Sequence, residues 1–269
     1  ARNWNFEFPR LGKTEMTRIV LQVFAVVAFF LIWKGYVHFF DVSPLVLPAP
    51  ELVVVALFRL LGQPDTYYHL GVTLAECLGG FLFAVVFGTV IGQLLGRVAL
   101  LDTIFKPFVI ALQVTPKVAL IPLFILWFGF GLESKIIVSA VLAFFPVFAN
   151  SYLGAKSVDR GLSEVFTVGQ AKQSRRFRLL VIPSSLPYIL TGMEMAIVLA
   201  IIGAVVGEFV AGTRGLGYLA TIKLQELEVD TLFAVVLLLA AIGFSLYFIV
   251  GSLRRIMIPW HESASKVAI

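Results

Sequence analysis

The sequence is poor in the residues that most metal and enzyme sites need. Its 269 residues include one cysteine and three histidines, and only 14% of them are charged, against about 25% in a soluble domain. The single Cys77 excludes an intrachain disulfide and a cysteine cluster for a metal. The histidines lie far apart along the chain (His38, His69 and His261) and suggest no metal site. No phosphate-binding loop of the pattern Gly, four residues, Gly-Lys-Ser/Thr is present, which excludes a nucleotide hydrolase of that type.

Apolar residues dominate the chain instead. They make up 59% of it, and the mean hydropathy is +0.97. A membrane-spanning helix needs roughly 20 mostly apolar residues, and six segments fit. We predict an all-α integral membrane protein whose six spans lie at about 17–37, 70–96, 104–128, 136–155, 187–211 and 231–253. Residues 17–40 lack a small-residue cleavage site, so we interpret them as a retained first span rather than a signal peptide.

Lysine and arginine are divided unevenly between the two sides that these spans define. Fifteen of the 21 lie with the N-terminal tail (1–16), the connection between the second and third spans, the loop at about 156–183 and the C-terminal tail (254–269). The positive-inside rule places these segments in the cytoplasm, so both termini of the six-helix domain (17–253) are predicted to be cytoplasmic. Loop charge also explains the pI of about 9.4 without a nucleic-acid partner.

Glycines recur at every fourth position in two of the predicted spans. Gly88, Gly92 and Gly96 follow this spacing in the second span, and Gly203 and Gly207 follow it in the fifth. Small residues at this spacing let helix backbones approach closely in lipid. We therefore predict tight helix packing along both rows, with a direct place in a transport pathway as the alternative.

The third span is expected to be broken. Three prolines lie within it (Pro107, Pro116 and Pro122), and proline removes a backbone donor and kinks a helix. Interrupted helices at membrane depth often mark transporter sites. Gln113, Thr115, Pro116 and Lys117 gather at the expected break, where an isolated charge costs at least about 2.5 kcal/mol. We predict that Lys117 faces a central passage; a snorkelling or glutamate-paired lysine is the alternative.

Three glutamates fall within predicted spans or at their ends: Glu76, Glu194 and Glu208. Carboxylates inside a membrane are by default candidates for a pathway or for pairing. Glu208 lies close to the outer end of the fifth span, where reaching the interface is a simpler explanation. With one lysine against three glutamates, the sign of the substrate's charge stays open.

The most informative stretch is the basic loop between the fourth and fifth spans. It runs from Ser163 through Gln170 to Pro183, and it carries four cations just before the next span: Lys172, Arg175, Arg176 and Arg178. A cationic, helix-forming cytoplasmic loop is typical of a docking surface for a partner. Contact with lipid head groups is the alternative, and both can hold.

This loop resembles the EAA loop of ABC importer permeases, which docks the ATP-hydrolysing subunit, and Glu164 and Pro183 keep the family spacing. The run from Pro116-Lys117 to Gly131, followed by Ser134-Lys135, is similar to the third-span signature of the permeases for nitrate, sulfonates, taurine and related compounds. Four further stretches agree in order over about residues 45–260: Thr73…Gly80-Phe81, Phe144-Phe145-Pro146…Asn150, Leu186 to Gly192, and Gly207-Glu208-Phe209 followed by Gly215-Leu216-Gly217-Tyr218.

The loop departs from the family pattern at three positions. Val165 and Phe166 stand where the family has alanines, and Gln170 stands where it has glycine, with Gly169 one place early. ATPase docking is still expected, but the detailed seat of the coupling helix is left open.

The resemblance implies the type I importer fold, a bacterial inner-membrane location and a set of partners. These are a second permease copy in a homodimer, two ATPase subunits that hold the ATP and Mg, and an extracytoplasmic binding protein. The chain itself would carry no cofactor, no metal and no catalytic residue. The implied coupling residues are Ser163, Glu164, Val165, Phe166, Gly169, Gln170, Arg175 and Arg176, and the implied binding-protein face is Gly215, Leu216, Gly217 and Tyr218.

The implied solute is small and polar or anionic, either nitrate-, sulfonate- or taurine-like or a heterocyclic vitamin precursor. Two other classes of protein stay open at this point. An ion-coupled secondary carrier would transport without ATP and would titrate its carboxylates during turnover. A structural or assembly subunit would bind partners but show no flux.

Overall fold

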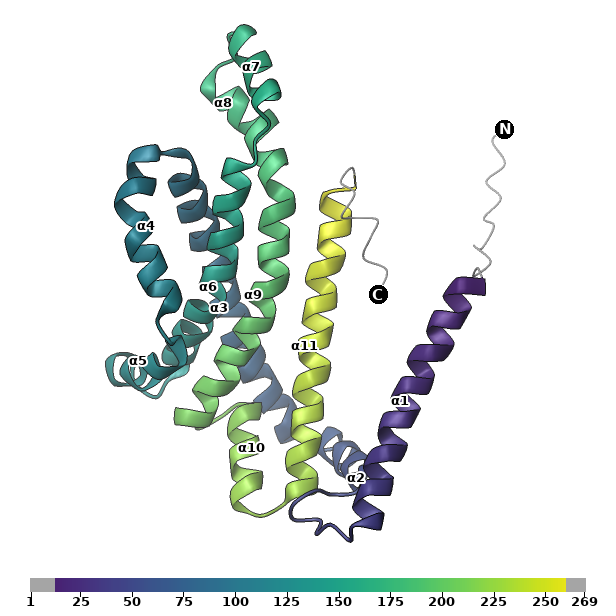
Figure 1. Ribbon diagram of the computed structural model, residues 1–269. Helices are drawn as coiled ribbons and strands as arrows, with labels where there is room; N and C mark the ends of the chain where they lie inside the picture. Colours follow the sequence, from purple (N-terminus) through teal and green to yellow (C-terminus); the bar gives the residue numbers. More distant parts are fainter. Residues whose placement is uncertain (1–12, 260–269) are drawn as a thin grey trace.

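The computed structural model describes residues 13–259, and every regular element in that part of the chain is a helix (Figure 1). In chain order the elements are α1 (Lys13–Phe39), α2 (Pro50–Leu61), α3 (Pro64–Arg97), α4 (Ala99–Val114), η1 (Lys117–Leu120), α5 (Ile121–Phe128), α6 (Leu132–Lys156), α7 (Arg160–Val168), α8 (Gln173–Arg176), η2 (Phe177–Val181), α9 (Ile182–Ala211), α10 (Leu216–Gln225) and α11 (Val229–Met257). The predicted all-α class is confirmed.

Six spans account for the long helices of the described region. Five helical segments are long and apolar enough to cross a membrane, and a sixth span results when the bent pair Ala99–Val114 and Lys117–Phe128 is counted as one. The predicted intervals agree with these helices, but the starts of α3, α4 and α9 were placed five or six residues too late. α3 begins at Pro64, where proline fits the first turn of a helix. α9 begins at Ile182 directly after η2, so the helical segment Gln173–Ala211 is continuous and Pro187 lies inside it.

The predicted break in the third span is confirmed, and Pro116 accounts for it. α4 ends at Val114, and the chain turns by 85° before it continues through η1 into α5. Thr115 has extended backbone angles (φ −61°, ψ 130°), as expected for a residue that precedes a proline. Pro107 stays within α4, and Pro122 lies in the first turn of α5, where its missing N–H costs nothing.

The centre of the molecule is a tight packing of α3, α6 and α9 (Figure 1). A Cβ atom on Gly92 of α3 would lie 2.6 Å from the carbonyl oxygen of Phe148 on α6. A Cβ on Gly203 of α9 would lie 2.7 Å from the Cα of Ser139, also on α6. Backbones therefore meet backbones where α3 and α9 each pack on α6, which confirms the packing role predicted for the glycine rows.

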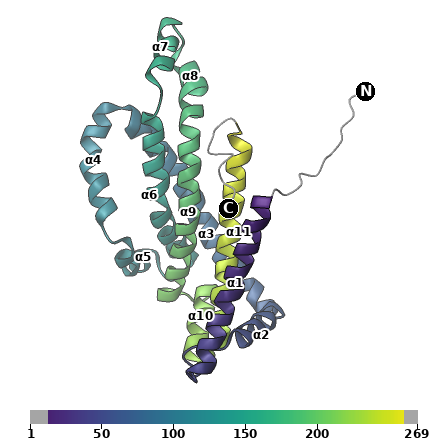
Figure 2. The same cartoon turned by 45° about the vertical axis from the view of Figure 1, so that its right-hand side comes forward.

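Two projections mark opposite ends of this bundle. α7 and α8 stand beyond one end, and α2 and α10 lie at the other (Figure 1). α1 lies on the outside and diverges from α11 towards its own start, although the two helices overlap in the view of Figure 2. Near α2 it contacts α11 through Trp33 and Phe233, whose ring centroids are 6.1 Å apart. α1 is tied to α2 by Lys34 and Glu51 at 2.9 Å. The hydrogen bond from Lys34 holds the pKa of the Glu51 carboxyl below its ordinary value.

Candidate functional sites

The first candidate site is α7, a short helix with a well-defined beginning and end. The Asp159 side chain caps its first turn by accepting a hydrogen bond from the Leu162 amide at 2.9 Å. The helix starts three residues before the segment 163–170 that the sequence suggested, and it stops at Val168. Arg176, from α8, donates a hydrogen bond to Ser163 Oγ and so ties the two short helices together.

The far end of α7 shows how the chain tolerates its departure from the family pattern. Gln170 has a positive φ of 48°, whereas Gly169 has an ordinary φ of −71°. The Ala171 amide donates to the Phe166 carbonyl at 3.0 Å and the Gln170 amide donates to the Thr167 carbonyl at 3.0 Å, which together form a Schellman cap. Gln170, not Gly169, therefore takes the left-handed position that glycine usually fills.

Replacing Gln170 with glycine is expected to stabilise the end of α7 by about 1 kcal/mol, because glycine adopts a positive φ without steric cost. Amide hydrogen exchange in α7 should slow by about fivefold. Gln170→Ala is the matched control, since it removes the same side chain but keeps a Cβ, and it should give no gain. Equal slowing in both variants would contradict a backbone origin.

The outer surface of α7 is a row of exposed apolar side chains. Leu162, Val165 and Val168 recur every third residue and are 52%, 65% and 84% exposed, so they share one broad face of the helix. Glu164 is exposed on the same short helix, and Phe166 is half-buried. An apolar face on a helix that stands beyond the bundle is what a protein partner would cover.

The second candidate site lies at the opposite end, around Glu208 of α9. This carboxylate is 1% exposed. It accepts hydrogen bonds from Thr73 Oγ1 at 2.6 Å and from the main-chain amides of Gly217 and Tyr218. The expectation that Glu208 simply reaches the membrane interface is therefore wrong, because α3 and the start of α10 enclose its side chain.

The segment from Gly215 to Tyr218 forms the wall of this enclosure. Gly215 and Leu216 donate their amides to His69 Nδ1 at 3.0 Å and to Thr73 Oγ1 at 2.8 Å. Gly215, Leu216 and Gly217 are buried, and only Tyr218 is partly exposed. The backbone of this segment therefore faces inward, and the exposed surface beside it belongs to Thr213 and Arg214.

A second carboxyl group joins Glu208 inside the bundle. Glu76 is 2% exposed, and its side chain lies next to that of Glu208. Its Oε2 atom has no hydrogen-bond partner among the described residues. A cavity of about 220 Å³ opens beside it and is also lined by Lys135 and Arg214. Lys135 donates to the carbonyls of Phe130 and Gly131.

Sequence reasoning missed three members of this cluster: His69, Thr73 and Lys135. His69 and Thr73 precede Glu76 at spacings of seven and three, which place all three on one face of α3, and this pattern was the available signal. No comparable signal pointed to Lys135, because the predicted spans place it in the loop just before the fourth span. The described residues contain no group of three His, Cys, Asp or Glu side chains that could hold a metal ion.

Glu194, the third predicted pathway carboxylate, has a partner on α11. Arg254 Nη1 lies 3.0 Å from Glu194 Oε2, and both side chains are 12% exposed. The pair lies in the half of the bundle that leads to α7 and α8, far along α9 from Glu208. It forms no part of the Glu76–Glu208 cluster.

The residues at the break in the third span are arranged around Lys117. Its ammonium group donates to the Gln113 carbonyl at 3.1 Å and lies 4.2 Å from the centre of the Phe145 ring on α6. Thr115 Oγ1 donates back to the Ala111 carbonyl within α4. Lys117 thus contacts an aromatic ring and the end of a helix. Among the described residues, no ion pair joins it to Glu76, Glu194 or Glu208.

Comparisons with known proteins agree with one another. The family described as binding-protein-dependent transport system inner membrane component matches residues 84–260. The formylaminopyrimidine transport permease protein ThiX of Halalkalibacterium halodurans is 34% identical and is matched over 82% of this chain and 88% of its own. The riboflavin transport system permease protein RibX of Chloroflexus aurantiacus is 34% identical over 96% of this chain and 93% of its own.

A solved structure shares the fold. A chain of the MetNI methionine ABC transporter, determined in inward-facing conformations, superimposes with a TM-score of 0.62 at 18% identity, over 72% of this chain and 98% of that one. The predicted importer-permease fold is thereby confirmed, and the ion-coupled carrier is not favoured. With six spans, this fold and these relatives, the chain belongs to the family of inner membrane components of binding-protein-dependent transport systems, as a permease subunit of an ABC importer.

Proposed function

We propose that two copies of this chain form the translocation pathway of the importer and that separate ATPase subunits drive it through α7. The observation that carries the proposal is the exposed apolar row on α7, with Val165 and Val168 at 65% and 84% exposure. The missing phosphate-binding loop supports ATP hydrolysis in another subunit. ATP and Mg would be bound there and not by this chain.

The charge distribution supports an orientation in which α7 and α8 face the cytoplasm. α1 begins and α11 ends at the same end of the bundle as these helices (Figure 1), and most lysines and arginines of the chain lie in the segments at this end. The opposite end, with α2, α10 and the exposed Thr213 and Arg214, would then receive the extracytoplasmic binding protein. Gly215 to Tyr218 would support this surface from behind.

The solute is proposed to be a small heterocycle or a small anion. The names of ThiX and RibX, a formylaminopyrimidine and a riboflavin permease, favour the heterocycle. The broken third span supports a passage close to Gln113, Thr115, Pro116 and Lys117, since interrupted helices supply polar groups at membrane depth. Glu76 and Glu208 would lie towards the outer mouth of that passage.

Reversing the charge of Glu164 tests the docking role of α7. Proteoliposomes that contain the permease, its ATPase and its binding protein are expected to lose substrate-stimulated ATP hydrolysis by at least tenfold in Glu164→Lys, because a lysine beside the apolar row disfavours the docked state. Thr103→Lys adds a positive charge to an exposed residue of α4, outside both α7 and the surface proposed for the binding protein, and should leave the stimulation unchanged.

Two results would overturn the proposal. Normal stimulation in Glu164→Lys, with the ATPase still bound, would remove α7 from coupling. Uptake by proteoliposomes that hold this chain alone and an ion gradient would replace the ATP-driven mechanism with a secondary carrier.

A further inference from the structure

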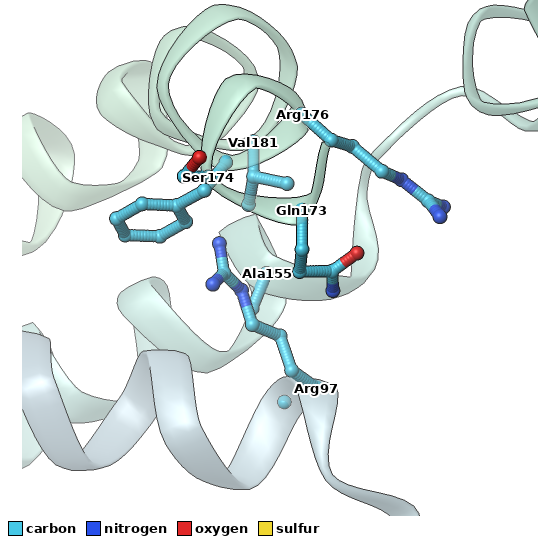
Figure 3. Close-up of a pocket in the computed structure, with 8 residues that line it drawn as sticks. Arg97, Ala155, Gln173, Ser174, Arg176 and Val181 are labelled. Carbon is cyan, nitrogen blue, oxygen red and sulfur yellow. The ribbon is translucent and has the colours of Figure 1, made fainter. Parts of the chain in front are cut away.

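A polar cavity of about 520 Å³ lies at the base of the α7–α8 projection, apart from the apolar row proposed for docking (Figure 3). Its walls come from the last residues of α3, the end of α6 and the turn formed by α8 and η2. The volume falls within the roughly 300–1,000 Å³ of sites that take small ligands. A π-helical turn, Phe177–Val181, forms part of the wall, and such turns are frequent at functional sites.

Arg97 is the central cation of this cavity. Its side chain reaches from the end of α3 towards the α8 turn, from which Gln173 points down beside it (Figure 3). The guanidinium carbon lies 4.3 Å from the centre of the Phe177 ring. Stacking uses the face of the guanidinium and leaves its N–H groups available at the edge. None of the ion pairs of the described residues involves Arg97.

The surroundings of the cavity carry positive charge without a counter-ion. Arg176 also lines it, but its side chain points away from Arg97 (Figure 3) and donates to Ser163. Asp102, an acidic residue at this end of the bundle, is engaged by Lys156 and Tyr152. No carboxylate is paired with either arginine within residues 13–259. An anion is therefore the ligand that this chemistry recognises.

The position of the cavity selects the kind of anion. Arg97 ends the 34-residue helix α3, and Gln173 to Val181 form the first turns of the apolar helical segment Gln173–Ala211, so the cavity lies at the ends of two candidate spans. Leu94 and Ile182, within one turn of these residues, expose apolar side chains that acyl chains would contact. Basic pockets between spans at this depth suit lipid head groups. We propose that the cavity binds the phosphate of an anionic phospholipid through Arg97, with Gln173 beside it.

An acidic side chain of the ATPase fits this position less well. α7 projects beyond the cavity (Figure 1), and its apolar row would keep a soluble partner at the tip of the projection. A lipid reaches the cavity from the side, within its own leaflet.

Native mass spectrometry of the purified full chain in neutral detergent tests the site. Titration with phosphatidylglycerol is expected to fill one site about tenfold more tightly than titration with phosphatidylcholine. Arg97→Gln should reduce the phosphatidylglycerol affinity to the phosphatidylcholine level. Arg178→Gln is the matched control, because Arg178 is exposed, carries the same charge and lies outside the cavity lining, and it should retain the preference.

Four outcomes would overturn the proposal. Equal losses of phosphatidylglycerol affinity in Arg97→Gln and Arg178→Gln would indicate a general charge effect. If the unmodified chain showed no preference for phosphatidylglycerol over phosphatidylcholine, the anionic lipid would be excluded as the ligand. Displacement of the lipid by inorganic phosphate at equal concentration would assign the cavity to a free anion. If Arg97→Gln unfolds in a thermal melt, Gln173→Trp fills the cavity without changing charge, and retained binding in that variant would contradict the site.

Discussion

Replacing Arg254 with methionine is expected to lower the free energy of unfolding by about 3–5 kcal/mol, because it leaves the Glu194 carboxylate charged and unpaired inside the bundle. The two side chains are 12% exposed each and lie 3.0 Å apart. Denaturant titration of the purified permease, followed by tryptophan fluorescence, measures the loss. An unchanged midpoint would show that water reaches Glu194 freely.

The double variant Glu194→Leu with Arg254→Met supplies the control. Arg254 Nε has no hydrogen-bond partner among the described residues, so the pair is incompletely satisfied, and an apolar replacement of both residues should recover most of the lost stability. The same variant also tests the pathway role predicted for Glu194. If stability and uptake both recover, the pair only joins α9 to α11; if stability recovers and uptake does not, Glu194 lies on the pathway.

Replacing Gly215 with alanine is expected to cost about 3 kcal/mol, the second large effect. Gly215 has φ 102° and ψ 165°, a region that is almost closed to residues with a Cβ, and such strain costs about 1–3 kcal/mol. The added Cβ would also collide with the carboxylate of Glu208, which would have to leave its Thr73 and Gly217 donors. A thermal melt should shift down by several degrees, and uptake should fall with it.

Gly71→Ala is the matched control for Gly215→Ala. Gly71 lies on α3 between His69 and Thr73, next to the same cluster, but a Cβ there would meet nothing within 4 Å. Alanine is favoured over glycine inside a helix by about 1 kcal/mol, so this variant should melt at the same or a higher temperature. A loss as large as that of Gly215→Ala would contradict the role assigned to the backbone conformation of Gly215.

Features that depend on local chemistry could be predicted from the sequence. Pro116 breaks the third span because the missing N–H and the restriction on Thr115 act wherever the residue stands. The short helix in the basic loop was expected from its resemblance to the EAA loop, although Asp159 starts it earlier than expected. Gly92 and Gly203 could be assigned to helix packing, because each belongs to a row of glycines spaced by four residues, which places the row on one stripe of its own helix.

Features that depend on which helices become neighbours could not be predicted. Thr73 and Glu208 are 135 positions apart, and nothing local links them. The prediction for Glu194 named a carboxylate but not its partner, because Arg254 was counted as a tail charge. Pro187 looked like a helix start, whereas it lies inside the continuous helical segment Gln173–Ala211. Each miss follows from the same cause, since tertiary contacts decide which of several locally acceptable arrangements is adopted.

The backbone contacts of Gly92 and Gly203 have a mechanical consequence. They lock α3, α6 and α9 into one body whose parts have no room to slide past one another. α6 (Leu132–Lys156) carries Lys135 near its start and ends four residues before α7, and α9 (Ile182–Ala211) carries Glu208 near its end. If a partner subunit acts on α7 as proposed, a displacement of α7 would therefore be transmitted to the carboxylates at the other end of the bundle without sliding between these helices.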